Sequence, residues 1–82
     1  MINVRVKLFA RAKDLAGTAE IVLKLPENAT VADLRRALAE RYPALDPLLA
    51  RSAIAVENDF SPDSLLLSDG VEAALLPPVS GG

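Results

Sequence analysis

Residues 20–42 read EIVLKLPENATVADLRRALAERY, and a strand pattern changes into a helix pattern within this stretch. Apolar and polar side chains alternate across residues 20–25, which predicts a half-buried strand with Ile21, Leu23 and Leu25 facing inward. Pro26-Glu27-Asn28 then ends the strand. The fold therefore contains at least one strand followed closely by a helix.

The helix begins after Thr30, which has Asp33 three residues later in a pattern close to a capping box. Apolar side chains recur at helical spacing and predict the buried face: Val31, Leu34, Ala37, Leu38, Tyr42 and, later, Leu45. Four charged side chains are expected on the solvent face: Arg35, Arg36, Glu40 and Arg41. Pro43 is expected to end the helix at about Tyr42.

The chain before this stretch predicts a first strand. Ile2, Val4, Val6 and Leu8 alternate with Asn3, Arg5, Lys7 and Phe9. Because this strand and residues 20–25 are neighbours in sequence, we expect them to pair antiparallel. The link from Ala10 to Thr18 is too long for a tight hairpin and is predicted to be a shaped loop.

The chain after the helix predicts several short elements. Residues 46–50 are expected to form a short helical turn, residues 53–57 a third strand and residues 58–59 a turn. Residues 65–67 are expected to be a short edge strand, residues 68–70 a turn and residues 71–76 the last strand. This order predicts one α+β domain over residues 1–82, with a mixed sheet and one main helix on one face, as in a β-grasp fold.

The composition excludes most side-chain chemistry. The chain contains no Cys and no His among its 82 residues, so it has no thiolate nucleophile, no disulfide and no histidine base. We therefore expect no metal site, because zinc is rarely held by carboxylates alone. Nine basic and 11 acidic residues give a net charge of −2, without the basic patch that nucleic acid or a membrane surface requires. We expect a cytoplasmic protein, because the sequence shows neither a signal peptide nor a spanning segment.

The C-terminal residues 77–82, PPVSGG, are the best candidate for function. Pro77 and Pro78 favour a stiff, extended path away from the sheet, and Val79 and Ser80 continue it. Gly81 and Gly82 leave the terminal carboxylate without neighbouring side chains, so it is able to enter a narrow channel. Six extended residues span about 20 Å, which is enough to reach into another protein.

A partner must hold this tail against its loss of conformational entropy, so we expect an apolar docking surface at its root. Ala74 and Leu76 are the candidates, on the face of the last strand opposite Val71, Ala73 and Leu75. The alternative is that both faces of this strand are buried. Elsewhere, the acidic residues Glu57, Asp59 and Asp63 are interpreted as solvated loop residues rather than a cation site, and Ser80 has no base to activate it.

Four segments resemble the small-subunit family of molybdopterin synthase, which is ubiquitin-like in fold. They are residues 8–17 (LFARAKDLAG), residues 29–34 (ATVADL), the Asp69-Gly70 turn and the ending PPVSGG. The resemblance covers the whole chain and is most specific at the tail. It departs from the family at Lys13, where an Arg that contacts the large subunit is usual, and at Gly70-Val71-Glu72-Ala73, where Gly-Asp-Glu-Val is usual.

The resemblance implies a sulfur carrier of molybdenum cofactor biosynthesis that is not catalytic alone. An E1-like activating enzyme would use ATP to adenylate Gly82, and a sulfurtransferase would supply the sulfur that replaces AMP. The resulting thiocarboxylate would donate sulfur to a pterin inside the synthase large subunit, in a heterotetramer of two small and two large subunits. It also implies a contact role for Lys13 and no cofactor bound by the chain itself.

Three other functions stay open. Another β-grasp carrier would feed sulfur to thiamine or to a modified tRNA base, and it would also end in two glycines. A ubiquitin-like modifier would be joined to lysine side chains through Gly82. A binding domain with an incidental tail would use neither chemistry.

Overall fold

The first two strands pair as the alternation predicts. In the computed structural model, which describes residues 1–77, β1 spans Ile2–Leu8 and β2 spans Glu20–Leu25. They are antiparallel, with Val4 opposite Leu23 and Val6 opposite Ile21. The predicted inward residues of both strands are buried, and the residues between them are exposed.

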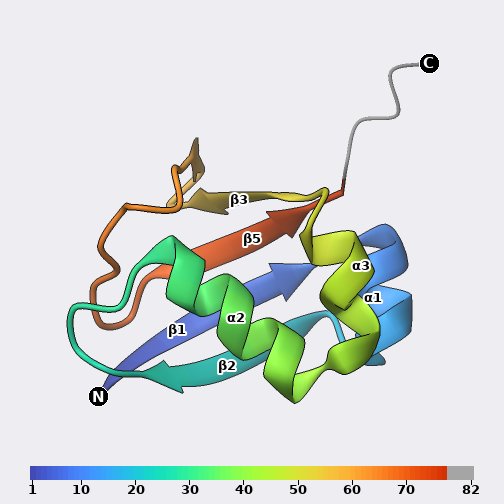
Figure 1. Ribbon diagram of the computed structural model, residues 1–82, viewed down its shortest axis with the longest axis horizontal. Coiled ribbons are helices and arrows are strands. Elements are labelled where there is room, and N and C mark those ends of the chain that lie inside the picture. The colour runs from blue at the N-terminus through green and yellow to red at the C-terminus, as the bar shows by residue number, and fades with distance from the viewer. Residues whose placement is uncertain (78–82) are drawn as a thin grey trace.

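The later strands complete a mixed sheet. The last strand, β5 (Glu72–Leu76), runs parallel to β1, and β3 (Ala53–Val56) runs antiparallel to β5. The two-residue strand β4 (Asp59–Phe60) pairs with β3, so the order across the sheet is β2-β1-β5-β3-β4. The last strand therefore lies at the centre of the sheet, between the first strand and β3 (Figure 1).

The main helix, α2 (Val31–Arg41), crosses one face of this sheet (Figure 1). Its predicted capping box is present: the Thr30 N–H donates to Asp33 Oδ2 (2.9 Å), and the Asp33 N–H donates to Thr30 Oγ1 (3.4 Å). The helix ends with Tyr42 as its C-cap, directly before the proline that was expected to stop it. Leu34 and Leu38 on its inner face are fully buried against the sheet residues.

The predicted loop between β1 and β2 is wrong, because this link contains the helix α1 (Ala10–Ala16). Gly17 ends α1 in the left-handed region at φ 75°, where its N–H donates to the Lys13 carbonyl (2.9 Å). Glycine adopts this conformation without the steric cost that a side chain carries. Only Ala12 of α1 is buried, so the sequence of this helix shows almost no helical repeat of buried apolar residues.

The predicted helical turn is confirmed as α3 (Asp46–Leu49), and the 3₁₀ helix η1 (Pro43–Leu45), which was not predicted, comes directly before it. Two smaller predictions need correction. The hairpin turn lies one residue earlier than expected, at Glu57 and Asn58, both with positive φ. Residues 65–67 do not form a strand, since Leu66 makes only an isolated bridge to Thr30.

Arg35 is not a solvent-facing side chain of α2, unlike its neighbour Arg36. Its Nε donates to Asp63 Oδ1 (2.9 Å) and its Nη1 donates to the Leu49 carbonyl (2.7 Å). The side chain is 25% exposed. Arg35 therefore joins α2 to α3 and to the loop after β4, a role that helical periodicity alone does not reveal.

Candidate functional site

The root of the predicted tail is held by the centre of the sheet. Strand β5 is bonded on both sides, to β1 and to β3, and it ends at Leu76. Pro77 follows as an exposed residue. The other predicted tail residues lie outside the described residues: Pro78, Val79, Ser80, Gly81 and Gly82. The structure thus shows that β5 ends where the predicted tail begins, and the activation of the terminal carboxylate stays a prediction.

The two faces of β5 differ as the alternation predicts. Ala73 and Leu75 point into the core and are 0% and 1% exposed. Ala74 and Leu76 lie on the opposite face, which we call the open face of the sheet, and they are half-buried. Burial of both faces was the alternative, and it does not hold for this strand because the open-face residues keep part of their surface accessible.

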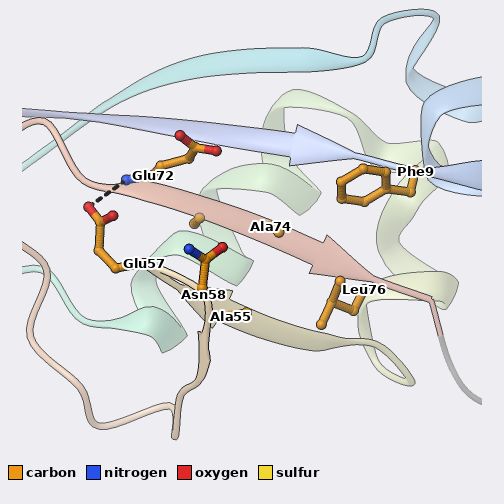
Figure 2. A pocket seen from close by; sticks show the side chains of 8 residues that line it. Phe9, Ala55, Glu57, Asn58, Glu72, Ala74 and Leu76 are labelled. Carbon is orange, nitrogen blue, oxygen red and sulfur yellow. Dashed lines mark hydrogen bonds between the residues drawn. The ribbon is translucent and has the colours of Figure 1, made fainter.

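Ala74 and Leu76 belong to a larger apolar surface. Phe9, after β1, and Leu76 lie near each other at one end of a pocket on the open face (Figure 2). Ala55 lies opposite Ala74 in the β3–β5 ladder, and Phe60 lies opposite Ala55 in the β3–β4 ladder. Partners in adjacent strands point to the same face of a sheet, so all five residues share the open face. We call Phe9, Ala55, Phe60, Ala74 and Leu76 the apolar patch.

Two aromatic side chains of this patch are exposed to a degree that is unusual for Phe. Phe9 is 45% exposed and Phe60 is 77% exposed. An exposed cluster of large apolar side chains on one face is typical of a surface that binds a protein. Phe9 was expected among the outward residues of the first strand, but neither Phe9 nor Phe60 was predicted as a site residue. An aromatic side chain at an outward position was the available signal.

Charged residues border the apolar patch. Lys7 Nζ donates to Glu72 Oε1 (2.8 Å), and Arg5 Nη2 lies 3.7 Å from Glu72 Oε2. The hydrogen bond between Lys7 and Glu72 raises the pKa of Lys7 and lowers the pKa of Glu72 relative to their ordinary values. Glu57 Oε1 accepts a hydrogen bond from the Glu72 N–H (3.3 Å; Figure 2). The open face therefore has an apolar centre with a mixed charged border.

Lys13, the other predicted interface residue, lies on α1 beside the patch. It is exposed and lines a second groove together with Phe9 and Lys7. Phe9 borders both this groove and the pocket on the open face. The structure therefore places Lys13 next to the apolar patch, although it lies in a helix that sequence analysis did not predict.

Two of the acidic residues considered as a cation site have other partners in the structure. Glu57 accepts from the β5 backbone, and Asp63 pairs with Arg35 at 2.9 Å. Within residues 1–77, no three His, Cys, Asp or Glu side chains are grouped so that they hold a metal. Over the same residues, no helix has the length and apolar character needed to cross a membrane.

Comparison with protein families gives a match to the ThiS family over residues 6–82. A molybdopterin synthase sulfur carrier subunit of Caenorhabditis briggsae is 33% identical over 84 residues, covering 100% of both chains. This relative is therefore similar to the chain from the first strand through the terminal residues.

Solved structures of several proteins resemble this fold. A protein of Pyrococcus furiosus, described as molybdopterin converting factor subunit 1, has a TM-score of 0.89 and 32% identity, covering 96% of this chain and 100% of its own. The small archaeal modifier protein 1 of Haloferax volcanii has a TM-score of 0.86 and 30% identity, covering 98% and 99%. A complex of subunits 1 and 2 of the molybdopterin-converting factor from Helicobacter pylori contains a chain with a TM-score of 0.71 and 28% identity, covering 99% and 100%.

Proposed function

Because the chain belongs to the ThiS family, we propose that it is the sulfur carrier subunit of a molybdopterin synthase in molybdenum cofactor biosynthesis. The observation that carries the proposal is the full-length match to a relative of that name, at 33% identity. The ubiquitin-like β-grasp fold agrees with it, because the central strand β5 leads directly into the terminal residues.

The working group in this proposal is the carboxylate of Gly82. A carboxylate is a poor electrophile, so one of its oxygens first attacks the α-phosphorus of ATP, which releases pyrophosphate and leaves an acyl-adenylate. A persulfide sulfur of the sulfurtransferase then attacks the acyl carbon and AMP leaves, which gives an acyl disulfide. A thiol of the partner proteins cleaves this disulfide, so that the thiocarboxylate is released and the two thiol sulfurs are left as a disulfide. The chain itself has no Cys and no His, so activation and sulfur delivery require other proteins. An E1-like adenylating enzyme and a sulfurtransferase fill these roles.

The apolar patch gives the folded body a means to dock on the synthase large subunit. Leu76 is the last residue of β5, so a partner that covers the patch also receives residues 77–82. Contacts at Phe9, Phe60 and Leu76 would offset the entropy that the tail loses when it is held. The complex of two such subunits in Helicobacter pylori supports a large-subunit partner. We propose an assembly of two small and two large subunits.

This role requires no cofactor on the chain, because ATP is bound by the activating enzyme and the pterin by the large subunit. We propose the cytoplasm as its location, since ATP-dependent activation takes place where ATP is supplied. Lys13 is proposed as a flanking contact, because it adjoins Phe9.

The proposal is tested by intact-mass measurement after the chain reacts with its activating enzyme, ATP and a sulfur donor. We expect a mass gain equal to one oxygen-to-sulfur exchange, located on the C-terminal peptide by fragmentation. A variant lacking Gly82 is the matched control and should gain nothing. An unmodified wild-type mass, with an active enzyme present, would contradict the carrier function.

A second candidate is a protein modifier, and the likeness to small archaeal modifier protein 1 favours it, at 30% identity. The same activated terminus would then be transferred to a lysine amine, forming an isopeptide bond and releasing the activating group. Affinity-purified chain from its host would carry lysine-linked partners that vanish when Gly82 is deleted. A carrier for thiamine or tRNA thiolation would give the thiocarboxylate but would not bind the synthase large subunit.

A further inference from the structure

Within residues 1–77, strand β2 forms one edge of the sheet, so one side of it pairs with no other strand. The Arg5 N–H of β1 donates to Val71 O (3.0 Å), on the side of β5. The Leu8 N–H donates to Ala19 O (2.8 Å), on the side of β2. The backbone groups of successive β1 residues therefore point alternately to β5 and to β2, and those of the even-numbered residues bond to β2.

The ladder partners then show which residues of β2 have free backbone groups. Hydrogen-bonded and non-hydrogen-bonded pairs alternate along an antiparallel ladder. The even-numbered residues of β1 lie opposite Ile21, Leu23 and Leu25, so these three bond to β1. The N–H and C=O groups of Val22 and Lys24 consequently point to the free edge. The backbone groups of Glu20 on this side are bonded to Thr18 Oγ1, which accepts from the Glu20 N–H (3.4 Å) and donates to the Glu20 carbonyl (3.1 Å).

The side chains of the same three residues are accessible on the open face. Val22 is 49% exposed, and Glu20 and Lys24 are exposed on either side of it. On the other side, β2 and α2 border a groove, with Ala37 and Arg41 on the helix side. Natural proteins usually protect such an edge with charges, and here the two charges are of opposite sign.

We propose that two copies of this chain pair antiparallel through β2, centred on Val22. This register places Val22 opposite Val22 of the second copy, and it places each Glu20 opposite Lys24 of the other copy. Both backbone groups of Val22 are free, so the central Val22 pair can exchange two N–H···O bonds. The Glu20–Lys24 pairs add backbone bonds when Thr18 Oγ1 releases the Glu20 backbone, and they add their charges in either case. Opposite charges facing each other across an antiparallel pair are stabilising, and like charges are destabilising. The edge is thus complementary to itself in the backbone groups of Val22 and in the charges of Glu20 and Lys24.

The pairing leaves the sulfur-carrier surfaces free. Strand β4, which carries Phe60, lies at the opposite edge of the sheet from β2, and β5 lies two strands away from β2. Antiparallel edge pairing has its two-fold axis perpendicular to the sheet, so both open faces point to the same side. A dimer would therefore present two apolar patches side by side, each with its own tail root.

Sedimentation equilibrium of the full-length chain, from micromolar to millimolar concentration, tests the pairing. We expect reversible dimerisation that Val22→Pro weakens roughly 5- to 150-fold, because two edge hydrogen bonds are lost at about 0.5–1.5 kcal/mol each. Proline is tolerated on an edge strand where its nitrogen faces solvent. Circular dichroism should confirm that the variant folds.

A charge exchange gives a second test that does not depend on proline. Lys24→Glu creates two like-charge pairs across the interface and should weaken the dimer roughly 2- to 30-fold. Adding Glu20→Lys restores opposite charges and should restore the dimer. Phe60→Ser, at the far edge, is the control and should leave dimerisation unchanged. A wild-type chain that stays monomeric, or a dimer that responds to Phe60→Ser but not to these changes in β2, would overturn the proposal.

Discussion

Leu76→Asp should separate docking on the large subunit from activation of the tail. Leu76 is half-buried on the open face, beside Phe9 and at the very end of β5. When a partner covers the apolar patch, the introduced carboxylate loses its water without gaining a hydrogen-bonding group. Burial of a neutral polar group without a partner costs about 1–3 kcal/mol in proteins, and an unpaired carboxylate costs more. Affinity for the large subunit should therefore fall by at least the roughly 5- to 150-fold that this range gives.

The same change should affect folding much less than binding. The side chain at position 76 stays in contact with water in the unbound chain, while Ala73 and Leu75 on the other face keep the core filled. Circular dichroism melts should show a folded variant, and isothermal titration calorimetry with the large subunit should show the loss of affinity. Thiocarboxylate formation, measured by intact mass, should persist if the activating enzyme captures mainly the tail.

Leu66→Asp provides a matched control for this experiment. Leu66 is a leucine that is 61% exposed, but it lies on the loop bridged to Thr30, away from the apolar patch. The control variant should bind the large subunit like the wild type. Unchanged affinity in folded Leu76→Asp, or an equal loss in both variants, would refute the docking role of the patch.

Two further predictions test the fold. Leu38→Ala should lower the free energy of unfolding by about 2–5 kcal/mol because its side chain is fully buried. Arg36→Ala, on the exposed face of α2, should change it by less than about 0.5 kcal/mol; urea melts that rank the two in reverse order would show that the helix faces are wrongly assigned. The hydrogen bond from the Thr30 N–H lowers the pKa of Asp33 below its ordinary 3.8, so this carboxylate stabilises the fold above that pH and the contribution is lost as pH falls through the folded-state pKa. Asp33→Asn should therefore lower the free energy of unfolding at neutral pH. Urea melts over a pH series should also show that the variant loses less unfolding free energy than the wild type when the pH falls below 3.8. An equal loss in the two chains would contradict the role of the cap.

Elements with a strong local pattern were predictable from the sequence, and elements defined by few buried residues were not. The alternation in residues 20–25 and the Thr30–Asp33 pair gave β2 and the start of α2 correctly. Helix α1 was missed because it buries only Ala12 and begins after Phe9 without a side-chain cap. A helix of this kind is specified by its contacts and by its glycine cap more than by periodicity.

The residues of the apolar patch also fall into those that a local pattern predicts and those that it does not. Ala74 and Leu76 were predicted because alternation within one strand assigns both faces. Ala55 and Phe60 join them only through the β5-β3-β4 pairing, which is a long-range property of the sheet. The order of strands depends on contacts between residues far apart in sequence, so a local pattern does not contain it.

The central claim is that the carboxylate of Gly82 is the group that is activated. ATP–pyrophosphate exchange with the cognate activating enzyme measures this step directly, before any sulfur is involved. The full-length chain should support exchange, and a chain lacking Gly82, or extended by one residue beyond it, should not. The melting temperatures of all three should agree, because residues 1–76 supply the described sheet and core. Full exchange with the shortened chain would contradict the account.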